Sequence, residues 1–313
     1  MNNDFSLKYY HRYTKQIISE RIFAKEFLFW AYNTTTGRFF NKILFRQKFV
    51  SKLYGLWHKQ SWSEKKIKPF IKNMNVNMRE SLKSTESFKS FNDFFTREID
   101  LSHRPVNQDD EVCVAPCDGR VLVYPKISAD SEFHIKRSSF KLGSFLQDDS
   151  LVQKYSGGSM LVSRLYLTDY HHFHFPDSGL PKKSSVMDGK YYATSPYSIR
   201  SLTPFYTENH RMLTQFESDN FGEIVITEIG AFTVGSIKQQ FQPDVQVGKG
   251  EHKGYFELGG STIVLLFEKG SVIFDSDLIR NSKYDLETYV RQGDSIGRSV
   301  KINNNNIHME INA

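Results

Sequence analysis

The chain has 313 residues and a formal net charge of +6, with 39% hydrophobic and 24% charged residues. This balance supports a folded core and excludes wholesale disorder, and the length corresponds to one large domain or two modest ones. The two cysteines, Cys113 and Cys117, exclude a disulfide framework, and their C-x-x-x-C spacing without a second pair predicts no metal site.

Positive charge is concentrated at the start of the chain. Residues 1–70 hold 14 Lys and Arg against four Asp and Glu, a net charge of +10, so the remaining 243 residues sum to −4. A basic arm on a slightly acidic body indicates an anionic partner, either a membrane surface or a nucleic acid. No run of 18 apolar residues would span a bilayer, and we expect no secretory signal in the opening MNNDFSLKYYHRYTK.

Residues 5–85 have the pattern of amphipathic helices. Aromatic faces beside basic residues are typical of helices that lie in a membrane interface, although such faces also dock helices onto a protein body. A nucleic acid partner is disfavoured because no base-reading motif accompanies the charge. We therefore predict a helical, membrane-associating region over residues 1–88. The apolar residues of its two helical stretches are Ile18, Ile22, Phe23, Phe27 and Trp30, then Phe39, Ile43, Phe45, Phe49, Leu53 and Leu56.

The pattern changes after about residue 90, where short apolar runs alternate with Gly, Asp, Asn and Pro. Runs such as GRVLVYP, SMLVSRLYL and STIVLLF are bounded by turn residues, which is typical of strands. No helix long enough for repeated βαβ units separates them. The predicted fold class is α+β, with a β-rich, sandwich- or barrel-like catalytic body over residues 89–313 and the helical region attached to it.

Two common catalytic signatures are absent, G-x-x-x-x-G-K-[ST] and H-E-x-x-H. Three other segments carry residues suited to chemistry, and the first is Pro116-Cys117-Asp118-Gly119, between two strand-like runs. An Asp-Gly pair is a common turn, but a carboxylate at a strand end is also able to orient a histidine.

A histidine cluster forms the second segment, Asp169-Tyr170-His171-His172-Phe173-His174. In an extended segment His172 and His174 share one face, whereas a bend would bring His171 and His174 together. Histidine is the natural proton carrier near neutral pH, and no carboxylates at metal-binding spacing accompany the cluster. A purely structural role for the three histidines stays open.

The third segment, Gly259-Gly260-Ser261-Thr262, precedes an apolar run. Glycine allows unusual dihedral angles and close backbone approach, so the segment is either a turn before a strand or the approach to a nucleophilic serine. The order Asp118, His174, Ser261 along the chain is compatible with a catalytic triad.

Together these segments resemble the phosphatidylserine decarboxylase family from about residue 9 to residue 300. The order and spacing of the segments make the resemblance specific. Its landmarks are Phe94-Phe95-Thr96-Arg97, Arg104-Pro105-Val106, Pro116-Cys117-Asp118-Gly119, Arg164-Leu165, Asp169-Tyr170-His171, His174-Phe175-Pro176, Glu208-Asn209-His210-Arg211, Ala231-Phe232-Thr233-Val234-Gly235-Ser236-Ile237 and Gly259-Gly260-Ser261-Thr262.

The resemblance implies a self-processing enzyme that converts phosphatidylserine to phosphatidylethanolamine and CO₂. Cleavage between Gly260 and Ser261 would give a β chain of residues 1–260 and a partner α chain of residues 261–313, 53 residues long. Ser261 would become a covalent pyruvoyl group, which is the cofactor. This pyruvoyl group would form a Schiff base with the substrate amine and take up electrons when CO₂ leaves.

Residue roles also follow from the resemblance. His174, oriented by Asp118, would remove the hydroxyl proton of Ser261, so that the alkoxide attacks the Gly260 carbonyl. His171 would return a proton to the substrate carbon after CO₂ has left. The resemblance therefore implies two histidines with separate tasks, one in self-cleavage and one in turnover.

Two positions depart from the family pattern. Cys117 stands where alanine is common, and Gly259 stands where one branch has leucine. Neither departure removes a reacting group, and other branches carry the double glycine. His172 falls where the family varies, so it is assigned no role.

The predicted location combines the resemblance with the basic arm. The substrate would be a lipid headgroup at the bilayer surface, and an anionic lipid would be concentrated by an arm of charge +10. We predict a peripheral protein on the cytoplasmic face of a bacterial cell membrane, without a nucleic acid partner. A homodimer is compatible with the sequence, which does not fix the oligomeric state.

Three alternative functions stay open at this stage. A Ser-His-Asp hydrolase would use Ser261 repeatedly on external esters and would keep it intact. A pyruvoyl-dependent decarboxylase of a soluble amino acid would not need the aromatic, basic arm. A non-catalytic membrane-binding β protein would explain the arm but would leave Asp118, His171, His174 and Ser261 without purpose.

Overall fold

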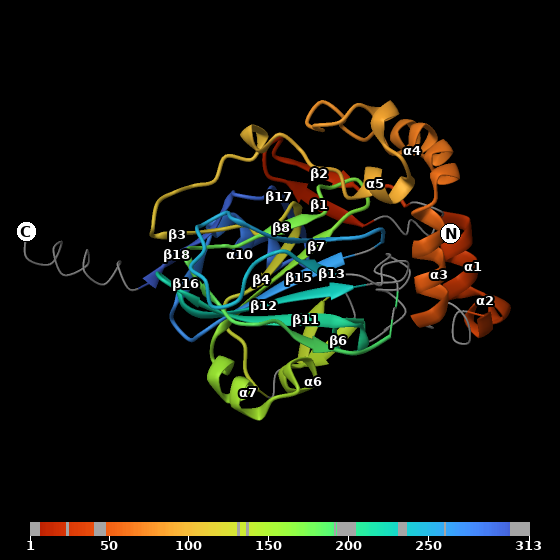
Figure 1. Ribbon diagram of the computed structural model, residues 1–313. Coiled ribbons are helices and arrows are strands. Elements are labelled where there is room, and N and C mark those ends of the chain that lie inside the picture. Colours follow the sequence, from red (N-terminus) through yellow and green to blue (C-terminus); the bar gives the residue numbers. More distant parts are fainter. Residues whose placement is uncertain are drawn as a thin grey trace, which may run out of the picture.

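The N-terminal helices lie at one side of a body built from β-sheets (Figure 1). This arrangement confirms the predicted α+β class with a strand-rich body and N-terminal helices. Among the described residues, no helix is long and apolar enough to cross a membrane. The computed structural model describes residues 7–22, 25–40, 48–129, 132–135, 138–190, 192, 205–230, 237–259 and 261–300.

Ten strands of the described residues form the main sheet, in which neighbours are antiparallel except for the parallel pair β1 and β17. Along β15, Ile263 and Val264 pack on opposite faces because successive side chains of a strand alternate, and both faces are buried. An unbroken apolar run therefore marks this central strand. In spatial order the strands are β10 (Ser185–Met187), β11 (Arg211–Ser218), β12 (Gly222–Gly230), β15 (Ser261–Phe267), β7 (Ser159–Leu165), β4 (Gly119–Tyr124), β17 (Glu287–Val290), β1 (Lys8–His11) and β2 (Gln16–Ser19), with β9 (Gly179–Pro181) beside β11.

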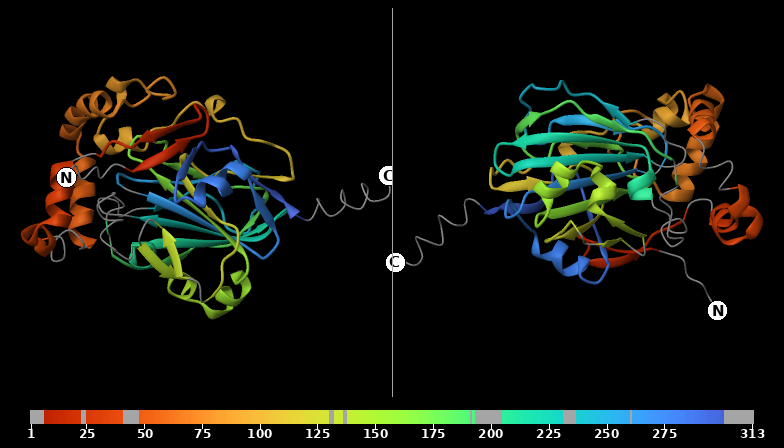
Figure 2. Two further views of the ribbon diagram at one scale, coloured as in Figure 1. Left: turned by 180° about the vertical axis from the view of Figure 1, so that it is seen from behind. Right: turned by 90° about the horizontal axis from the view of Figure 1, so that it is seen from below.

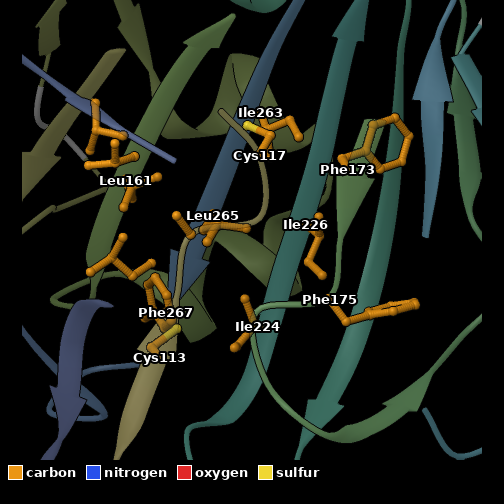
Figure 3. Close-up of a cluster of buried hydrophobic side chains, with 14 of the residues drawn as sticks. Cys113, Cys117, Leu161, Phe173, Phe175, Ile224, Ile226, Ile263, Leu265 and Phe267 are labelled. Carbon is orange, nitrogen blue, oxygen red and sulfur yellow. The ribbon is translucent and has the colours of Figure 1, made fainter. Parts of the chain in front are cut away.

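Smaller sheets supply the other half of a hydrophobic core on one face of the main sheet (Figure 3). Phe173 and Phe175 reach this core together with Cys113 and Cys117, and both thiols are free and buried. The helix α10 (Ser276–Ser282) adds Leu278 to the same core. The sheets that contribute to this core are β13 (Ile237–Gln239), β14 (His252–Phe256) and β8 (His172–His174), and β16 (Val272–Phe274), β18 (Ser295–Ser299) and β3 (Val112–Val114). A separate hairpin joins β5 (Glu132–Ile135) and β6 (Ser138–Lys141).

Short helices cover the opposite face of the main sheet, as the view from below shows (Figure 2). They are α6 (Leu142–Leu146), α7 (Asp149–Tyr155) and α9 (Phe205–Glu208). Phe145 and Tyr155 pack there against the alternate side chains of the central strands. Strand β15, which begins at Ser261, is therefore buried on both of its faces.

The prediction of helix from residue 5 onward is wrong for residues 8–19. Strands β1 and β2 form a hairpin that joins the main sheet at β17, and Lys15 closes its turn with a φ of 58°. Ile18 pairs with Tyr9, and the adjacent β-branched Ile17 and Ile18 suit a strand. The helical spacing from Ile18 onward is therefore coincidental, because pairing with distant strands overrides a local pattern.

Helices follow this hairpin, as the sequence predicts. The last of them dock on the body, because Phe70 of α4 and Phe94 of α5 share a buried cluster with Leu258. Phe23, Ile43 and Phe45 lie outside the described residues, and the division of the chain after residue 88 stays a prediction. The helices are α1 (Lys25–Asn33), α2 (Thr35–Phe40), α3 (Lys48–His58), α4 (Ile67–Met74) and α5 (Phe91–Phe95), with 3₁₀ turns η2 (Ser61–Lys66), η3 (Thr85–Ser87) and η4 (Leu101–His103).

The earlier helices keep large apolar side chains in contact with solvent. We call these residues of α1, α2, α3 and η2 the aromatic surface: Phe27, Phe29, Phe39, Phe40, Leu53, Leu56, Trp57 and Trp62. Their exposed fractions range from 38% to 60%. Docking on the body explains α4 and α5, whereas exposed apolar groups gathered in this way are typical of a contact surface.

Candidate active site

Ser261 begins strand β15, opposite Gly230 of β12 and Leu165 of β7. Its side chain is fully buried, and its Oγ has no hydrogen-bond partner among the described residues. Gly259 has a φ of 141°, in the region that favours glycine, while Gly260 lies outside the described residues. Buried hydroxyl groups usually have a partner, so this one is a candidate for chemistry.

His174 ends strand β8, and its main-chain N–H donates to the Pro116 carbonyl at 2.8 Å. Its Nδ1 lies 3.0 Å from the carbonyl oxygen of Gly250. A carbonyl only accepts, so Nδ1 carries the proton and Nε2 keeps its lone pair. This Nε2 is buried without a partner in the described part of the chain. Burial lowers the pKa of His174 to about 3, which leaves a neutral imidazole with an unoccupied basic nitrogen.

His171 has the same arrangement with a different partner. Its Nδ1 donates to the carbonyl oxygen of Asp169 at 3.0 Å, and its buried Nε2 has no partner among the described residues. The Phe95 ring packs 4.0 Å from the imidazole, centroid to centroid. Burial lowers the pKa of His171 to about 3, and the nearby guanidinium of Arg97 acts in the same direction. His171 is therefore a second neutral imidazole with one free nitrogen.

Asp118 directly precedes strand β4 and is buried between two donors. Arg104 grips its carboxylate with Nε at 2.9 Å and Nη2 at 2.7 Å, and the main-chain N–H of Gln292 donates at 2.9 Å. No direct hydrogen bond joins Asp118 to His174 among the described residues. Burial dominates the pKa of His174, and the Asp118 charge opposes that effect through space. The orientation of His174 by Asp118 therefore stays a prediction.

Strand pairing gathers the segments that carry these residues. Ser261 pairs with Leu165, at the end of the strand that leads to His171. On the other side of Ser261, the main-chain N–H of Phe256 donates to the carbonyl of His171 at 2.9 Å. The chain just before and just after the predicted cleavage position is therefore bound to the segment of the histidine cluster.

His172 differs from its two neighbours because both of its ring nitrogens have partners. Nδ1 lies 2.8 Å from Nε2 of His252, and Nε2 lies 3.0 Å from the carbonyl oxygen of Thr96. The Tyr170 ring stacks on this imidazole at 4.8 Å. These contacts give His172 a structural explanation, which agrees with the absence of an assigned role.

Two contacts of the site escaped sequence reasoning. Arg104 belongs to one of the family landmarks, but the sequence alone assigns it no role. A buried carboxylate such as Asp118 needs a cation as partner, and Arg104 is that cation. Gly250 gave no signal, because it acts through its main-chain carbonyl. Among the described residues, no group of three or more His, Cys, Asp or Glu side chains is arranged to hold a metal ion.

The fold and site define a strand-rich α+β protein with a buried serine hydroxyl and two buried imidazole nitrogens that lack hydrogen-bond partners among the described residues. The family model described as phosphatidylserine decarboxylase matches residues 91–298. A phosphatidylserine decarboxylase proenzyme of Clostridium beijerinckii is 40% identical over 294 residues, which cover 94% of this chain and 99% of the relative. A proenzyme of the same name from Chlamydia felis is also 40% identical, over 94% of this chain and 98% of its own. The chain belongs to the phosphatidylserine decarboxylase family, as the resemblance predicted.

Proposed function

We propose that this chain is the proenzyme of a phosphatidylserine decarboxylase, which cleaves itself between Gly260 and Ser261. The observation that carries the proposal is the buried, unpaired hydroxyl of Ser261 at the start of a central strand. Relatives named as phosphatidylserine decarboxylase proenzymes match this chain over nearly their whole length, which supports the same assignment here.

His174 acts as the base in self-cleavage. Its Nε2 accepts the hydroxyl proton of Ser261, and the alkoxide adds to the carbonyl carbon of Gly260. The peptide nitrogen takes up the proton and leaves, which converts the peptide bond into an ester. Loss of the Cα proton of Ser261 expels the carboxylate of Gly260 and leaves a dehydroalanine. Water converts this residue to the pyruvoyl ketone with release of ammonia.

Asp118 stabilises the charge that develops on His174. Burial disfavours a protonated imidazole, and a carboxylate nearby compensates for part of that cost. Arg104 and the main-chain N–H of Gln292 hold this carboxylate in place. We therefore assign to Asp118 an electrostatic role that needs no direct hydrogen bond to the histidine.

The residues around Ser261 fit a pyruvoyl group at that position. The Oγ of Ser261, which leaves with the carboxylate of Gly260, has no hydrogen bond to lose among the described residues, and Gly259 brings no side chain to the site. When present, the group supplies a conjugated ketone that takes up the electron pair released with CO₂. Nε2 of His171, which is unprotonated in the free protein, would take up the proton that the substrate ammonium group loses and return it to the substrate carbon, while the Asp169 carbonyl holds the other ring nitrogen.

The two chains stay together after cleavage because the α chain is woven into the sheets. Strand β15 pairs with β12 on one side and β7 on the other, and β17 pairs with β4 and β1. Separation would break these ladders and expose the apolar side chains of β15 on both faces. The α chain therefore remains a noncovalent partner of the β chain.

We further propose that the aromatic surface docks the enzyme on the cytoplasmic face of a bacterial membrane. Exposed aromatic rings on the basic N-terminal helices suit the interface of an anionic bilayer, where the substrate headgroup lies. Cosedimentation with vesicles that contain phosphatidylserine tests this proposal. A homodimer stays a prediction, and analytical ultracentrifugation in detergent would test it.

Mass spectrometry of the denatured protein tests the central proposal. We expect two chains, with the smaller one corresponding to residues 261–313 and its serine converted to a pyruvoyl group. Borohydride reduction in the presence of phosphatidylserine should attach the lipid amine to that chain. Ser261→Ala should remain a single, inactive chain, since it has no hydroxyl to attack Gly260. A full-length wild-type chain with ester hydrolase activity would contradict the proposal, and trapping of a soluble amino acid alone would change the substrate.

A further inference from the structure

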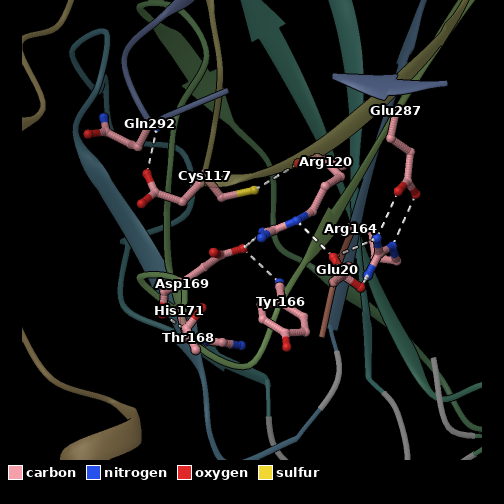
Figure 4. A network of polar contacts seen from close by, with 12 residues as sticks. Glu20, Cys117, Arg120, Arg164, Tyr166, Thr168, Asp169, His171, Glu287 and Gln292 are labelled. Carbon is pink, nitrogen blue, oxygen red and sulfur yellow. Dashed lines mark hydrogen bonds and ion pairs between the residues drawn. The ribbon is translucent and has the colours of Figure 1, made fainter. Parts of the chain in front are cut away.

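Glu20 lies outside the residues that the family model matches, yet it is buried in the body (Figure 4). Arg164 donates to it twice, from Nη1 at 2.9 Å and from Nη2 at 3.1 Å. On the other side, Nε of Arg120 lies 3.0 Å from Oε2 of Glu20. Glu20 thus lies between two buried cations, at the point where the N-terminal hairpin ends.

Arg120 links Glu20 to the segment that carries His171. The guanidinium of Arg120 forms an ion pair with Glu20 at its Nε side, without hydrogen-bond geometry, and donates a hydrogen bond to Asp169 through Nη1. The Asp169 carboxylate also accepts from the main-chain N–H of Tyr166 at 2.7 Å, and its own N–H donates to the Tyr166 carbonyl at 2.8 Å. These contacts close the turn of residues 166–169, and the Asp169 carbonyl at its end receives the proton of His171 Nδ1.

A second contact ties the same turn to the N-terminal segment. The hydroxyl of Tyr166 donates to the main-chain carbonyl of Arg21 at 2.5 Å. Residues 20 and 21 follow the β1–β2 hairpin and precede α1, the first helix of the aromatic surface. The segment between the hairpin and the helices therefore contacts the turn of residues 166–169 directly through Arg21 and indirectly through Arg120.

We propose that Glu20 is a positioning residue for His171, acting through Arg120 and the turn of residues 166–169. This inference rests on the proposed function, because it assigns His171 to turnover. A guanidinium with a carboxylate at each end is held in one orientation, and it fixes the carbonyl that orients the imidazole. A displacement of about 1 Å at such a group lowers a rate by as much as a hundredfold.

The contacts separate turnover from self-cleavage. The contacts that start at Glu20 end at His171, whose Nδ1 donates to the Asp169 carbonyl. His174 is held separately, because its Nδ1 donates to the Gly250 carbonyl. A defect in the position of His171 should therefore slow decarboxylation and leave self-cleavage complete. A loss of general stability would not make this distinction.

The test compares Glu20→Gln with Glu287→Gln. Both variants remove a buried carboxylate from Arg164, and in the described part of the chain Glu20 forms a further ion pair with Arg120. We expect Glu20→Gln to process fully and to lose about tenfold in kcat per pyruvoyl chain, with KM within about twofold. Glu287→Gln should keep kcat within about twofold. Equal losses in the two variants, or an unchanged kcat in Glu20→Gln, would overturn the proposal.

Tyr166→Phe keeps every charge and removes only the hydrogen bond to Arg21. We expect it to lower kcat about threefold without affecting self-cleavage. If Glu20→Gln does not fold, an unchanged kcat in Tyr166→Phe overturns the proposal by itself. A wild-type protein without decarboxylation would instead contradict the proposed function, so the two failures are distinguishable.

Discussion

The histidine cluster and the aromatic surface differ in the solvent exposure of their ring side chains. His171, His172 and His174 are buried with relative exposures of 0%, 5% and 1%, whereas Phe39 and Phe40 of α2 are 60% and 48% exposed. Burial keeps the imidazoles neutral and removes water from the unpartnered nitrogens of His171 and His174. Exposure leaves the phenyl rings available to a bilayer. On the proposed function, the first region would serve proton transfer away from water and the second would serve attachment to the membrane.

Loss of a catalytic imidazole should have the largest effect. His174→Ala should slow self-cleavage by about 10²–10⁴, because it removes the Nε2 that we assign as the base. His171→Ala should process normally and lose about 10²–10³ in kcat, since it acts only in turnover. Gel electrophoresis over time measures the first rate, and release of labelled CO₂ measures the second.

His172→Gln is the matched control for both variants. Both ring nitrogens of His172 are engaged with His252 and Thr96, so its removal weakens packing without removing a proton carrier. We expect processing and turnover within about fivefold of wild type. A block of either step in His172→Gln would break the distinction between free and engaged imidazoles.

Residues close in sequence made much of this site predictable. Ser261 after two glycines and the histidine cluster indicated the chemistry, and the apolar run after Ser261 indicated a central strand. The contacts that tune the site were unpredictable because they join distant residues, as Glu20 and Arg164 do across 144 positions. For the same reason the helical prediction is wrong for β1 and β2. The pairing of β1 with the distant strand β17 cannot be recognised from the residues near it in the sequence.

Acid should destabilise the buried region. The pKa of His171 and His174 falls to about 3, and that of His172 to about 4, because of burial. The unfolded chain binds these protons below pH 6.5, so the free energy of unfolding falls as the pH drops from 6.5 to about 4. Burial raises the pKa of Asp169 to about 6, so the folded chain binds more protons at this carboxylate than the unfolded chain does. This cancels the contribution of one histidine to the pH dependence of the free energy of unfolding. These four groups together contribute a slope of roughly 3 kcal/mol per pH unit.

Urea unfolding at pH 7, 6, 5 and 4.5 measures this slope. His172→Gln should reduce it by about 1.4 kcal/mol per pH unit, because one titrating group is removed. A free energy of unfolding that is constant between pH 6.5 and 5 would contradict the neutral state of the buried imidazoles.

The aromatic surface should affect attachment and leave the chemistry intact. Phe39→Ser with Phe40→Ser should weaken binding to phosphatidylserine vesicles about tenfold, since each ring loses apolar contact with the bilayer. Turnover of substrate dispersed in detergent should remain within about twofold. Tyr284→Ser is the control, because this residue is 81% exposed and follows α10 on the body. If Tyr284→Ser and the double variant lose vesicle binding equally, any exposed aromatic ring contributes to binding and the aromatic surface has no special role.

Cys117 should have the smallest effect, although it lies one residue from Asp118. Its thiol is fully buried in contact with Ser163 at 3.4 Å, and burial raises its pKa far above the ordinary value. A protonated thiol is a poor nucleophile, so it should not add to the ketone formed from Ser261. Cys117→Ala should therefore keep processing and kcat within about twofold, like the control Cys113→Ala. Reaction of the native protein with Ellman's reagent before unfolding would show instead that water reaches this core, and the neutral imidazoles would then lose their physical basis.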